Sequence, residues 1–129
     1  MIEKERFYNV FVVEDDRFYL ELLKSYLSTK QNLRVTCFAS GEDCILNIGL
    51  KPDLVLLDYL LDKENPYAMD GRNVYKIIKN LSPASNIIVV SAQQSAEVVF
   101  GLVQEGVKNY VMKNKQTFNE LDQLLEQYA

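Results

Sequence analysis

Five short apolar runs alternate with five amphipathic segments along the chain, and this alternation constrains the fold more than any other feature. The runs are rich in Val, Ile, Leu and aromatic residues and are too short for helices, so each predicts a β-strand. The first, third and fourth runs are apolar at successive positions, which is typical of strands covered on both faces. The five runs cover residues 8–14, 33–39, 53–58, 86–91 and 108–112.

The segments between the runs place apolar residues three and four positions apart, which predicts helices with one buried face. Gly106 is expected to end the fourth of them. A β-α unit repeated five times predicts an α/β fold with a parallel sheet, helices on both faces and right-handed crossovers. The helical segments cover residues 16–28, 41–50, 71–81, 95–106 and 116–128.

The length of 129 residues suits one domain. We predict a single domain over 1–129, with a loose N-terminal segment at 1–6 and an extended loop at 59–70. The net charge of -4 argues against direct binding of nucleic acid. No apolar run approaches the roughly 20 residues of a membrane span, and the start of the chain does not resemble a signal peptide. Cys37 and Cys44 lie in apolar patterns without ligand partners, so we expect reduced thiols and a cytoplasmic location.

The chain contains no histidine, and this absence excludes several kinds of chemistry. Ser-His-Asp and Cys-His catalysis both require histidine, as does a phosphohistidine carrier. A zinc site is also disfavoured. Any chemistry must therefore use carboxylates, hydroxyl groups, lysine or a bound metal.

Polar residues stand directly after four of the predicted strands. Because the carboxyl ends of parallel strands share one edge of the sheet, we expect these side chains to form one site. Clustered carboxylates favour a hard cation such as Mg²⁺, and a carboxylate can attack phosphorus to give an aspartyl phosphate. A lysine and a hydroxyl group would help to neutralise the phosphoryl oxygens. The residues are Glu14, Asp15 and Asp16 after the first strand, Asp58 after the third, Ser91 at the end of the fourth and Lys113 after the fifth.

These residues and their surroundings resemble the receiver domain of bacterial two-component response regulators. The resemblance covers about residues 7–128 and rests on "VVEDD", "LVLLDYLL", "MDG", "VVSA" and "YVMK". Each motif alone is weak, but all five in order at strand ends are highly specific. The resemblance implies a five-stranded, flavodoxin-like sheet of order 2-1-3-4-5. It also implies a phosphoacceptor signalling switch, which catalyses only its own phosphorylation and dephosphorylation.

The resemblance assigns a role to each residue of the acidic site. Asp58 would be the phosphoacceptor, taking a phosphoryl group in a magnesium-dependent reaction. Mg²⁺, with Mn²⁺ as a substitute, would be held by Asp15, Asp58 and the main-chain carbonyl of Leu60, and by Glu14 through water. Asp16 is better explained as the N-cap of the first helix than as a ligand.

The resemblance also assigns the residues that bind the phosphoryl group and respond to it. Ser91, Lys113 and the main-chain N–H of Ala92 would bind the phosphoryl oxygens. Ser91 and Tyr110 would be the switch residues that alter the surface of the fourth helix, fifth strand and fifth helix. Three structural alternatives remain open. The spacing in "SAQQ" also fits a helix capping box beginning at Ser91, Lys113 could be a surface lysine, and Tyr110 could be only a packed aromatic residue.

The implied partners are a sensor histidine kinase or a histidine phosphotransfer protein. Phe18 and Tyr19 are candidates for docking it, although such residues are usually core or half-buried. The output would be a downstream protein, or an output domain of the same chain if this sequence is part of a longer one. The protein would be a monomer or a phosphorylation-dependent dimer, without direct contact with nucleic acid or membrane.

Three departures from the family pattern lead to further expectations. The loop after Asp58 is longer than usual, and we predict that it protrudes and partly covers Asp58 or provides a partner surface; the alternative is a tolerated insertion. Asn114 replaces a proline, so the preceding peptide bond should be trans, with an altered start to the last helix. Ser91 replaces the commoner threonine. Leu60 and Gln93 occupy positions that influence dephosphorylation, and Leu60 predicts a long-lived phosphoryl group.

The main alternative function is an interaction module of the same fold that does not use phosphate. A phosphatase with an aspartyl nucleophile would need a second acid at the position of Leu60. A flavin-binding protein of similar topology would need a hydroxyl- and glycine-rich loop after the first strand. That position carries three acids that would repel a phosphate.

Overall fold

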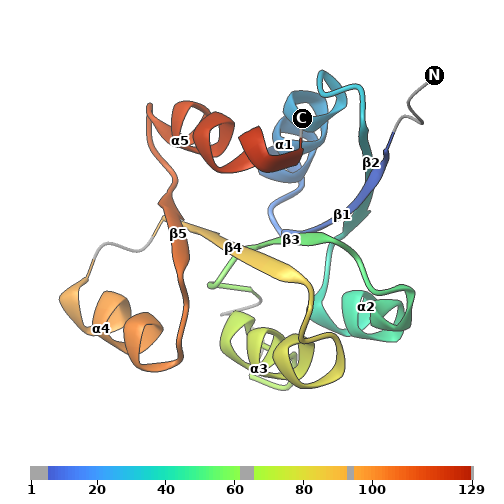
Figure 1. Ribbon diagram of the computed structural model, residues 1–129. Helices are drawn as coiled ribbons and strands as arrows, with labels where there is room; N and C mark the ends of the chain where they lie inside the picture. Colours follow the sequence, from blue (N-terminus) through green and yellow to red (C-terminus); the bar gives the residue numbers. More distant parts are fainter. Residues whose placement is uncertain (1–5, 62–65, 93–94, 129) are drawn as a thin grey trace.

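The computed structural model describes residues 6–61, 66–92 and 95–128. They form a five-stranded sheet in the order β2-β1-β3-β4-β5, with every neighbouring pair parallel (Figure 1). The predicted sheet and strand order are therefore confirmed. The strands are β1 Tyr8–Val13, β2 Leu33–Phe38, β3 Leu54–Leu57, β4 Asn86–Ser91 and β5 Asn109–Met112.

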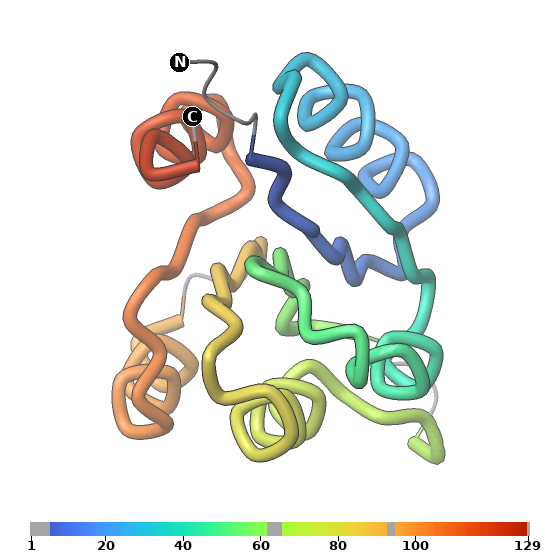
Figure 2. The backbone as a smooth tube through the Cα atoms, turned by 45° about the vertical axis from the view of Figure 1, so that its right-hand side comes forward, coloured from blue at the N-terminus to red at the C-terminus, as the bar shows by residue number. Residues whose placement is uncertain are grey.

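Helices cover both faces of the sheet, as the alternation predicted. Figures 1 and 2 show α1 and α5 on one face and α2, α3 and α4 on the other. None of the helices in the described part of the chain is long and apolar enough to cross a membrane. The helices are α1 Arg17–Ser28, α2 Gly41–Leu46, α3 Gly71–Leu81, α4 Ala96–Gln104 and α5 Thr117–Leu124.

Two predicted helices are shorter than expected, because each changes to a tighter 3-10 turn. The segment 41–50 leaves the α-helix at Asn47, whose Nδ2 donates a hydrogen bond to the Asp43 carbonyl, and continues as Ile48–Leu50. The segment 116–128 likewise ends its α-helix at Leu124 and continues as Leu125–Tyr128. Such turns use carbonyl groups that an α-helix would leave without a partner at its end.

Alternate residues of the strands pack into two separate cores. Phe11 and Val13 of β1 belong to the core beneath α2, α3 and α4. Val10 and Val12 belong to the core beneath α1 and α5. Side chains of a strand point alternately to opposite faces, so a strand buried on both faces must be apolar throughout. This explains why the runs in β1, β3 and β4 lack polar alternation.

Side-chain caps fix the starts of four helices, α1 to α4. Asp16 Oδ1 accepts hydrogen bonds from the N–H groups of Phe18 at 3.0 Å and Tyr19 at 3.2 Å, so its predicted role as N-cap is confirmed. In α4 the cap is Ser95, which accepts from the N–H of Val98 at 3.3 Å. The capping-box alternative for Ser91 is therefore wrong, since Ser91 is the last residue of β4. Asp70 caps α3 in the same way.

The segments that flank β5 agree with two expectations from the sequence, one for Gly106 and one for Asn114. Gly106, with a φ of 84°, follows the end of α4 as predicted. No cis peptide bond occurs among the described residues, so the bond before Asn114 is trans. The Asn114 side chain accepts from the N–H of Gln116 at 2.7 Å, and Thr117 Oγ1 accepts from the Asn114 N–H at 2.8 Å. Asn114 thus shapes the turn that leads into α5.

The described part of the long loop turns back toward α2. The N–H of Met69 donates to Glu42 Oε1 at 2.8 Å, and Tyr67 is 97% exposed. The loop residues Asp62, Lys63 and Glu64 lie outside the described residues, as does Gln93. The predictions that depend on them, and the one for the N-terminal segment before Arg6, stay predictions.

Candidate functional site

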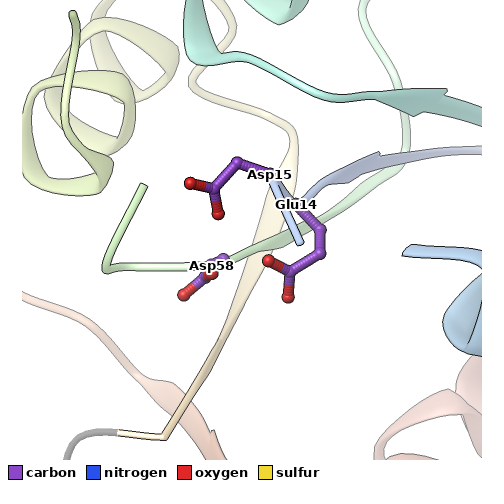
Figure 3. A group of neighbouring side chains, drawn as sticks. All are labelled: Glu14, Asp15 and Asp58. Carbon is purple, nitrogen blue, oxygen red and sulfur yellow. The ribbon is translucent and has the colours of Figure 1, made fainter. Parts of the chain in front are cut away.

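Three carboxylates meet at the carboxyl ends of the two central strands. Glu14 and Asp15 follow β1, and Asp58 follows β3, the neighbour of β1 on the side where the strand order reverses. One oxygen of each carboxylate lies within 4.8 Å of the others (Figure 3). Glu14 and Asp58 are only 1% and 6% exposed, whereas Asp15 is exposed. The structure thus brings together the three acids that the sequence placed in one site.

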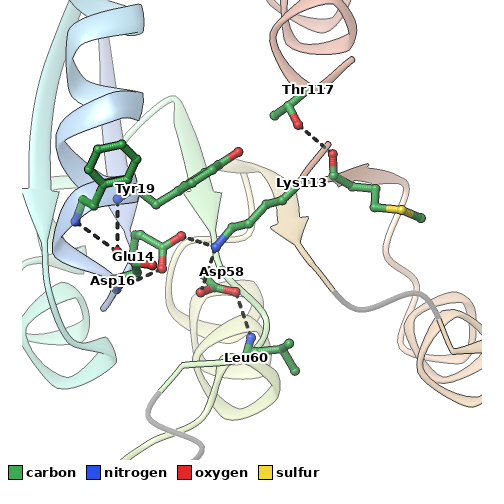
Figure 4. A network of polar contacts seen from close by, with 9 residues as sticks. Glu14, Asp16, Tyr19, Asp58, Leu60, Lys113 and Thr117 are labelled. Carbon is green, nitrogen blue, oxygen red and sulfur yellow. Dashed lines mark hydrogen bonds and ion pairs between the residues drawn. The ribbon is translucent and has the colours of Figure 1, made fainter. Parts of the chain in front are cut away.

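Lys113 reaches this acidic group from the end of β5. Its N–H donates to the Ser91 carbonyl at 2.9 Å, which holds the backbone beside the end of β4. Its Nζ forms a short ion pair with Glu14 Oε1 and lies 3.4 Å from Asp58 Oδ2 (Figure 4). The sequence analysis placed Lys113 at this edge to bind phosphoryl oxygens, beside Asp58. In the structure the closer partner is Glu14, because the buried Glu14 side chain turns toward the lysine.

Main-chain N–H groups hold the remaining carboxylate oxygens. Glu14 Oε2 accepts from the N–H of Asp16 at 3.2 Å, and Asp58 Oδ1 accepts from the N–H of Leu60 at 3.0 Å. Each buried carboxylate is therefore oriented by a turn that directly follows its strand. These two bonds could not be predicted from the sequence, because both depend on the path of the turn.

Burial makes the acidic group costly to ionise in the absence of a cation. It raises the pKa of Glu14 from 4.5 to about 8, the neighbouring Asp58 carboxylate adds to the rise, and Lys113 partly opposes it. The pKa of Lys113 is also raised: burial alone would lower it, but the bond to Glu14 and the charge of Asp58 outweigh burial. Ionisation of Glu14 is therefore costly in this group, and Lys113 stays charged.

The donor set fits a hard divalent cation. Carboxylate oxygens are the ligands that Mg²⁺ prefers, and two of the three carboxylates are largely withdrawn from water. One lysine provides a single positive charge against up to three negative charges in this group. A bound cation would remove this imbalance, so the residues present are compatible with the predicted metal site.

In the metal-free protein, protonated Glu14 is expected to contribute stability that is lost as the pH rises through neutrality and Glu14 ionises. Because the folded-state pKa is raised from 4.5 to about 8, this contribution is complete below pH 4.5 and is lost as the pH approaches and passes 8. Mg²⁺ binding requires the ionised carboxylate, so Mg²⁺ should raise the melting temperature more at about pH 8 than at about pH 6. Thermal denaturation at both pH values measures this difference.

The matched variant for this experiment is Glu14→Gln, which keeps the shape of the side chain and cannot ionise. It should flatten the pH dependence of the metal-free protein and reduce the response to Mg²⁺. A Mg²⁺ effect that is equal at both pH values, or absent in the wild type, would contradict this account of the acidic site.

Gly71 brings the start of α3 against the turn that follows Asp58. A Cβ atom at this position would lie 2.4 Å from the carbonyl oxygen of Tyr59 and 2.5 Å from its Cα. Real Cβ contacts essentially never occur at such distances, so only glycine fits here. This glycine is the last residue of the motif "MDG", and the motif alone does not reveal the contact with Tyr59. The glycine allows α3 to lie against the backbone of Tyr59, directly after Asp58.

The predicted phosphoryl-binding and switch residues lie along the same edge or beside it. Ser91 is fully buried at the end of β4, and Ala92 follows it as an exposed residue. Tyr110 of β5 is half-buried and packs against the core beneath α2, α3 and α4. Burial raises the pKa of its hydroxyl group. The roles of Ser91, Ala92 and Tyr110 stay predictions.

The two candidate docking residues differ in their surroundings. Phe18 is 77% exposed, which contradicts the expectation of a core or half-buried residue. Tyr19 is half-buried, and its ring centroid lies 4.3 Å from Lys113 Nζ. Sequence reasoning missed this contact between residues that are far apart along the chain.

Comparisons with known proteins identify the family. A family model described as "Response regulator receiver domain" matches residues 10–126. The response regulator protein VraR of Staphylococcus epidermidis is 30% identical over 121 residues, which cover 92% of this chain and 56% of the relative. The probable C4-dicarboxylate response regulator DctR of Bacillus subtilis is 30% identical over 130 residues, covering 99% of this chain and 54% of the relative. The chain spans about half the length of these curated relatives.

Solved structures support the same assignment. A CheY-like receiver domain protein from Methanospirillum hungatei JF-1 has a TM-score of 0.79 at 22% identity and covers 94% of this chain and 93% of its own. A structure titled "BeF3 Activated DrrB Receiver Domain" has a TM-score of 0.74 at 27% identity and covers 93% of this chain and 98% of its own. Because the family model matches most of its length, the chain belongs to the receiver domain family of response regulators.

Proposed function

We propose that the protein is a phosphorylation-controlled signalling switch in which Asp58 accepts the phosphoryl group. The observation that carries this proposal is the meeting of Glu14, Asp15, Asp58 and Lys113 at the carboxyl edge of the central strands. Receiver domains are regulatory, and this arrangement matches their chemistry. It combines a buried carboxylate with an acidic cation site and a lysine.

In the proposed reaction a carboxylate oxygen of Asp58 attacks the phosphorus of a phosphohistidine. The new O–P bond forms as the P–N bond breaks, and the imidazole nitrogen keeps the electron pair and takes up a proton. The N–H of Leu60 holds Asp58 Oδ1 at 3.0 Å, which orients the carboxylate before the attack. Mg²⁺, held by Asp15, Asp58 and the Leu60 carbonyl with Glu14 through water, would offset negative charge on the phosphoryl oxygens; Mn²⁺ would serve as a substitute.

Ser91, Lys113 and the N–H of Ala92 would bind the phosphoryl oxygens after transfer. Ser91 lies at the end of β4. The main-chain N–H of Lys113 donates a hydrogen bond to the carbonyl of Ser91. Recruitment of both groups would shift the segment after β4 and allow Tyr110 to reorient. The surface of α4, β5 and α5 would change as a result.

The proposed partners are those of a two-component pathway. A sensor histidine kinase or a histidine phosphotransfer protein would donate the phosphoryl group in the cytoplasm, with Phe18 and Tyr19 near the docking site. The exposed ring of Phe18 suits such a contact. Output would pass to a downstream protein or to a further domain of the same chain. The names of the relatives, response regulators and probable response regulators, support this placement.

A titration with beryllofluoride and Mg²⁺ tests the proposal, since beryllofluoride mimics a phosphoryl group on aspartate. The wild type should show saturable changes in its NMR spectrum that include Ser91, Tyr110 and Lys113. Asp58→Asn should show none of them while remaining folded. If the wild type does not respond, the switch proposal fails, and the phosphate-independent interaction module becomes the better interpretation.

A further inference from the structure

The aromatic ring of Tyr19 lies over the ammonium group of Lys113. The distance from Nζ to the ring centroid is 4.3 Å, and Figure 4 shows the ring alongside the lysine side chain. An ammonium group over the face of an aromatic ring is attracted by the negative potential of that face. Tyr19 thus contacts the same lysine that contacts Glu14 and Asp58.

Tyr19 is held in place by both its backbone and its side-chain packing. Its N–H donates to the Asp16 cap at 3.2 Å, so the start of α1 fixes the backbone of Tyr19. The side chain is half-buried and packs against the core beneath α1 and α5. The same Asp16 residue donates its N–H to Glu14 Oε2. One short segment therefore positions both the carboxylate and the ring that contact Lys113.

Lys113 needs such support because of the nature of its side chain. A lysine carries its charge on a flexible four-carbon stem, whose ordering costs entropy. Its two carboxylate partners contact only Nζ, at the end of this stem. The Lys113 side chain is nevertheless only 15% exposed. The Tyr19 ring supplies a rigid surface along which the stem lies.

We propose that Tyr19 is a positioning residue that fixes the Lys113 ammonium group for the phosphoryl oxygen. The ring face limits the positions of Nζ to those near Glu14 and Asp58, so less entropy is lost when the phosphoryl group arrives. This inference rests on the proposed function for its effect on phosphoryl binding. The contact between ring and lysine in the unmodified protein does not depend on that function.

The first experiment therefore measures the contact alone, in the absence of Mg²⁺ and beryllofluoride. An aromatic ring face shifts the NMR signals of nearby protons upfield. The Lys113 Hε protons should show this shift in the wild type and in Tyr19→Phe, which keeps the ring. Tyr19→Leu should lose it, and Phe7→Leu should keep it as the matched control, because the Phe7 ring contacts the guanidinium of Arg34 and not Lys113. If Tyr19→Leu does not fold, Tyr19→Met provides a second apolar replacement of similar size.

The second experiment measures the affinity for beryllofluoride in the presence of saturating Mg²⁺. Tyr19→Leu or Tyr19→Met should bind roughly twofold to thirtyfold more weakly than the wild type. Tyr19→Phe and Phe7→Leu should bind nearly as the wild type does. Recovery in Tyr19→Phe assigns the effect to the ring face rather than to the hydroxyl group.

The outcomes separate this inference from the proposed function. Wild-type affinity in the ring-free variants, or a Lys113 Hε shift that survives loss of the ring, would overturn the inference and leave the proposed function intact. A wild type that does not bind beryllofluoride would overturn the proposed function. In that case the Hε shift alone would decide whether Tyr19 positions Lys113.

Discussion

Gly71→Ala is expected to lower the free energy of unfolding by roughly 3 kcal/mol. The added Cβ would lie 2.4 Å from the carbonyl oxygen of Tyr59, which is a backbone atom and cannot turn aside as a side chain could. Either α3 or the turn that follows Asp58 must move. Urea denaturation at constant pH measures the loss. Because the displaced turn orients Asp58, the variant should also respond more weakly to Mg²⁺.

Gly101→Ala is the matched control for this prediction. Gly101 lies within α4, and a Cβ atom there would have no neighbour within 4 Å. Alanine is a better helix former than glycine, so this variant should be unchanged or up to about 1 kcal/mol more stable. If Gly71→Ala matched the wild type, the close approach of α3 to Tyr59 would not be a constraint on the fold.

Lys113→Met is expected to lower the free energy of unfolding by about 3–5 kcal/mol at pH 8. The variant removes the cation that contacts Glu14 and Asp58 while leaving both carboxylates buried. The loss should be smaller near pH 5, because burial already raises the pKa of Glu14 to about 8 and a protonated Glu14 needs no cation. Urea denaturation of the metal-free protein at the two pH values measures both effects.

Two comparisons make the result specific. Lys115→Met removes an exposed lysine two residues away and should change stability little. Combining Lys113→Met with Glu14→Gln should restore part of the lost stability, because one of the two uncompensated carboxylates is gone. Equal losses from Lys113→Met and Lys115→Met, or no dependence on pH, would show that the buried charge contact does not stabilise the fold.

The fold could be predicted from the sequence because its signals are local. Runs such as 86–91 are apolar on both faces of a strand, and 71–81 carries one apolar helical face; the structure reproduces both ranges. The shortened helix at 41–50 could not be predicted from this periodicity. Its end depends on the hydrogen bond that Asn47 makes back to Asp43.

The arrangement of the site could be predicted only to the level of strand ends. Parallel strands bring Asp15 and Asp58 to one edge whatever their side chains do, so this proximity follows from topology. The pairing of Lys113 with Glu14, and the ring of Tyr19 over Lys113, depend on side-chain rotamers and on residues far apart along the chain. The spacing in "SAQQ" was misleading for a similar reason, since Ser95 forms the cap after β4 has ended.

Phosphorylation mapped to a residue tests the central claim most directly. The protein is incubated with a small acyl phosphate donor in Mg²⁺ or in EDTA, and its mass is measured before and after peptide cleavage. The account predicts one added phosphoryl group in Mg²⁺, located in the peptide that contains Asp58. It predicts none in EDTA and none in Asp58→Asn. A wild type that gains no phosphoryl group, or an Asp58→Asn variant that still gains one, would contradict Asp58 as the phosphoacceptor.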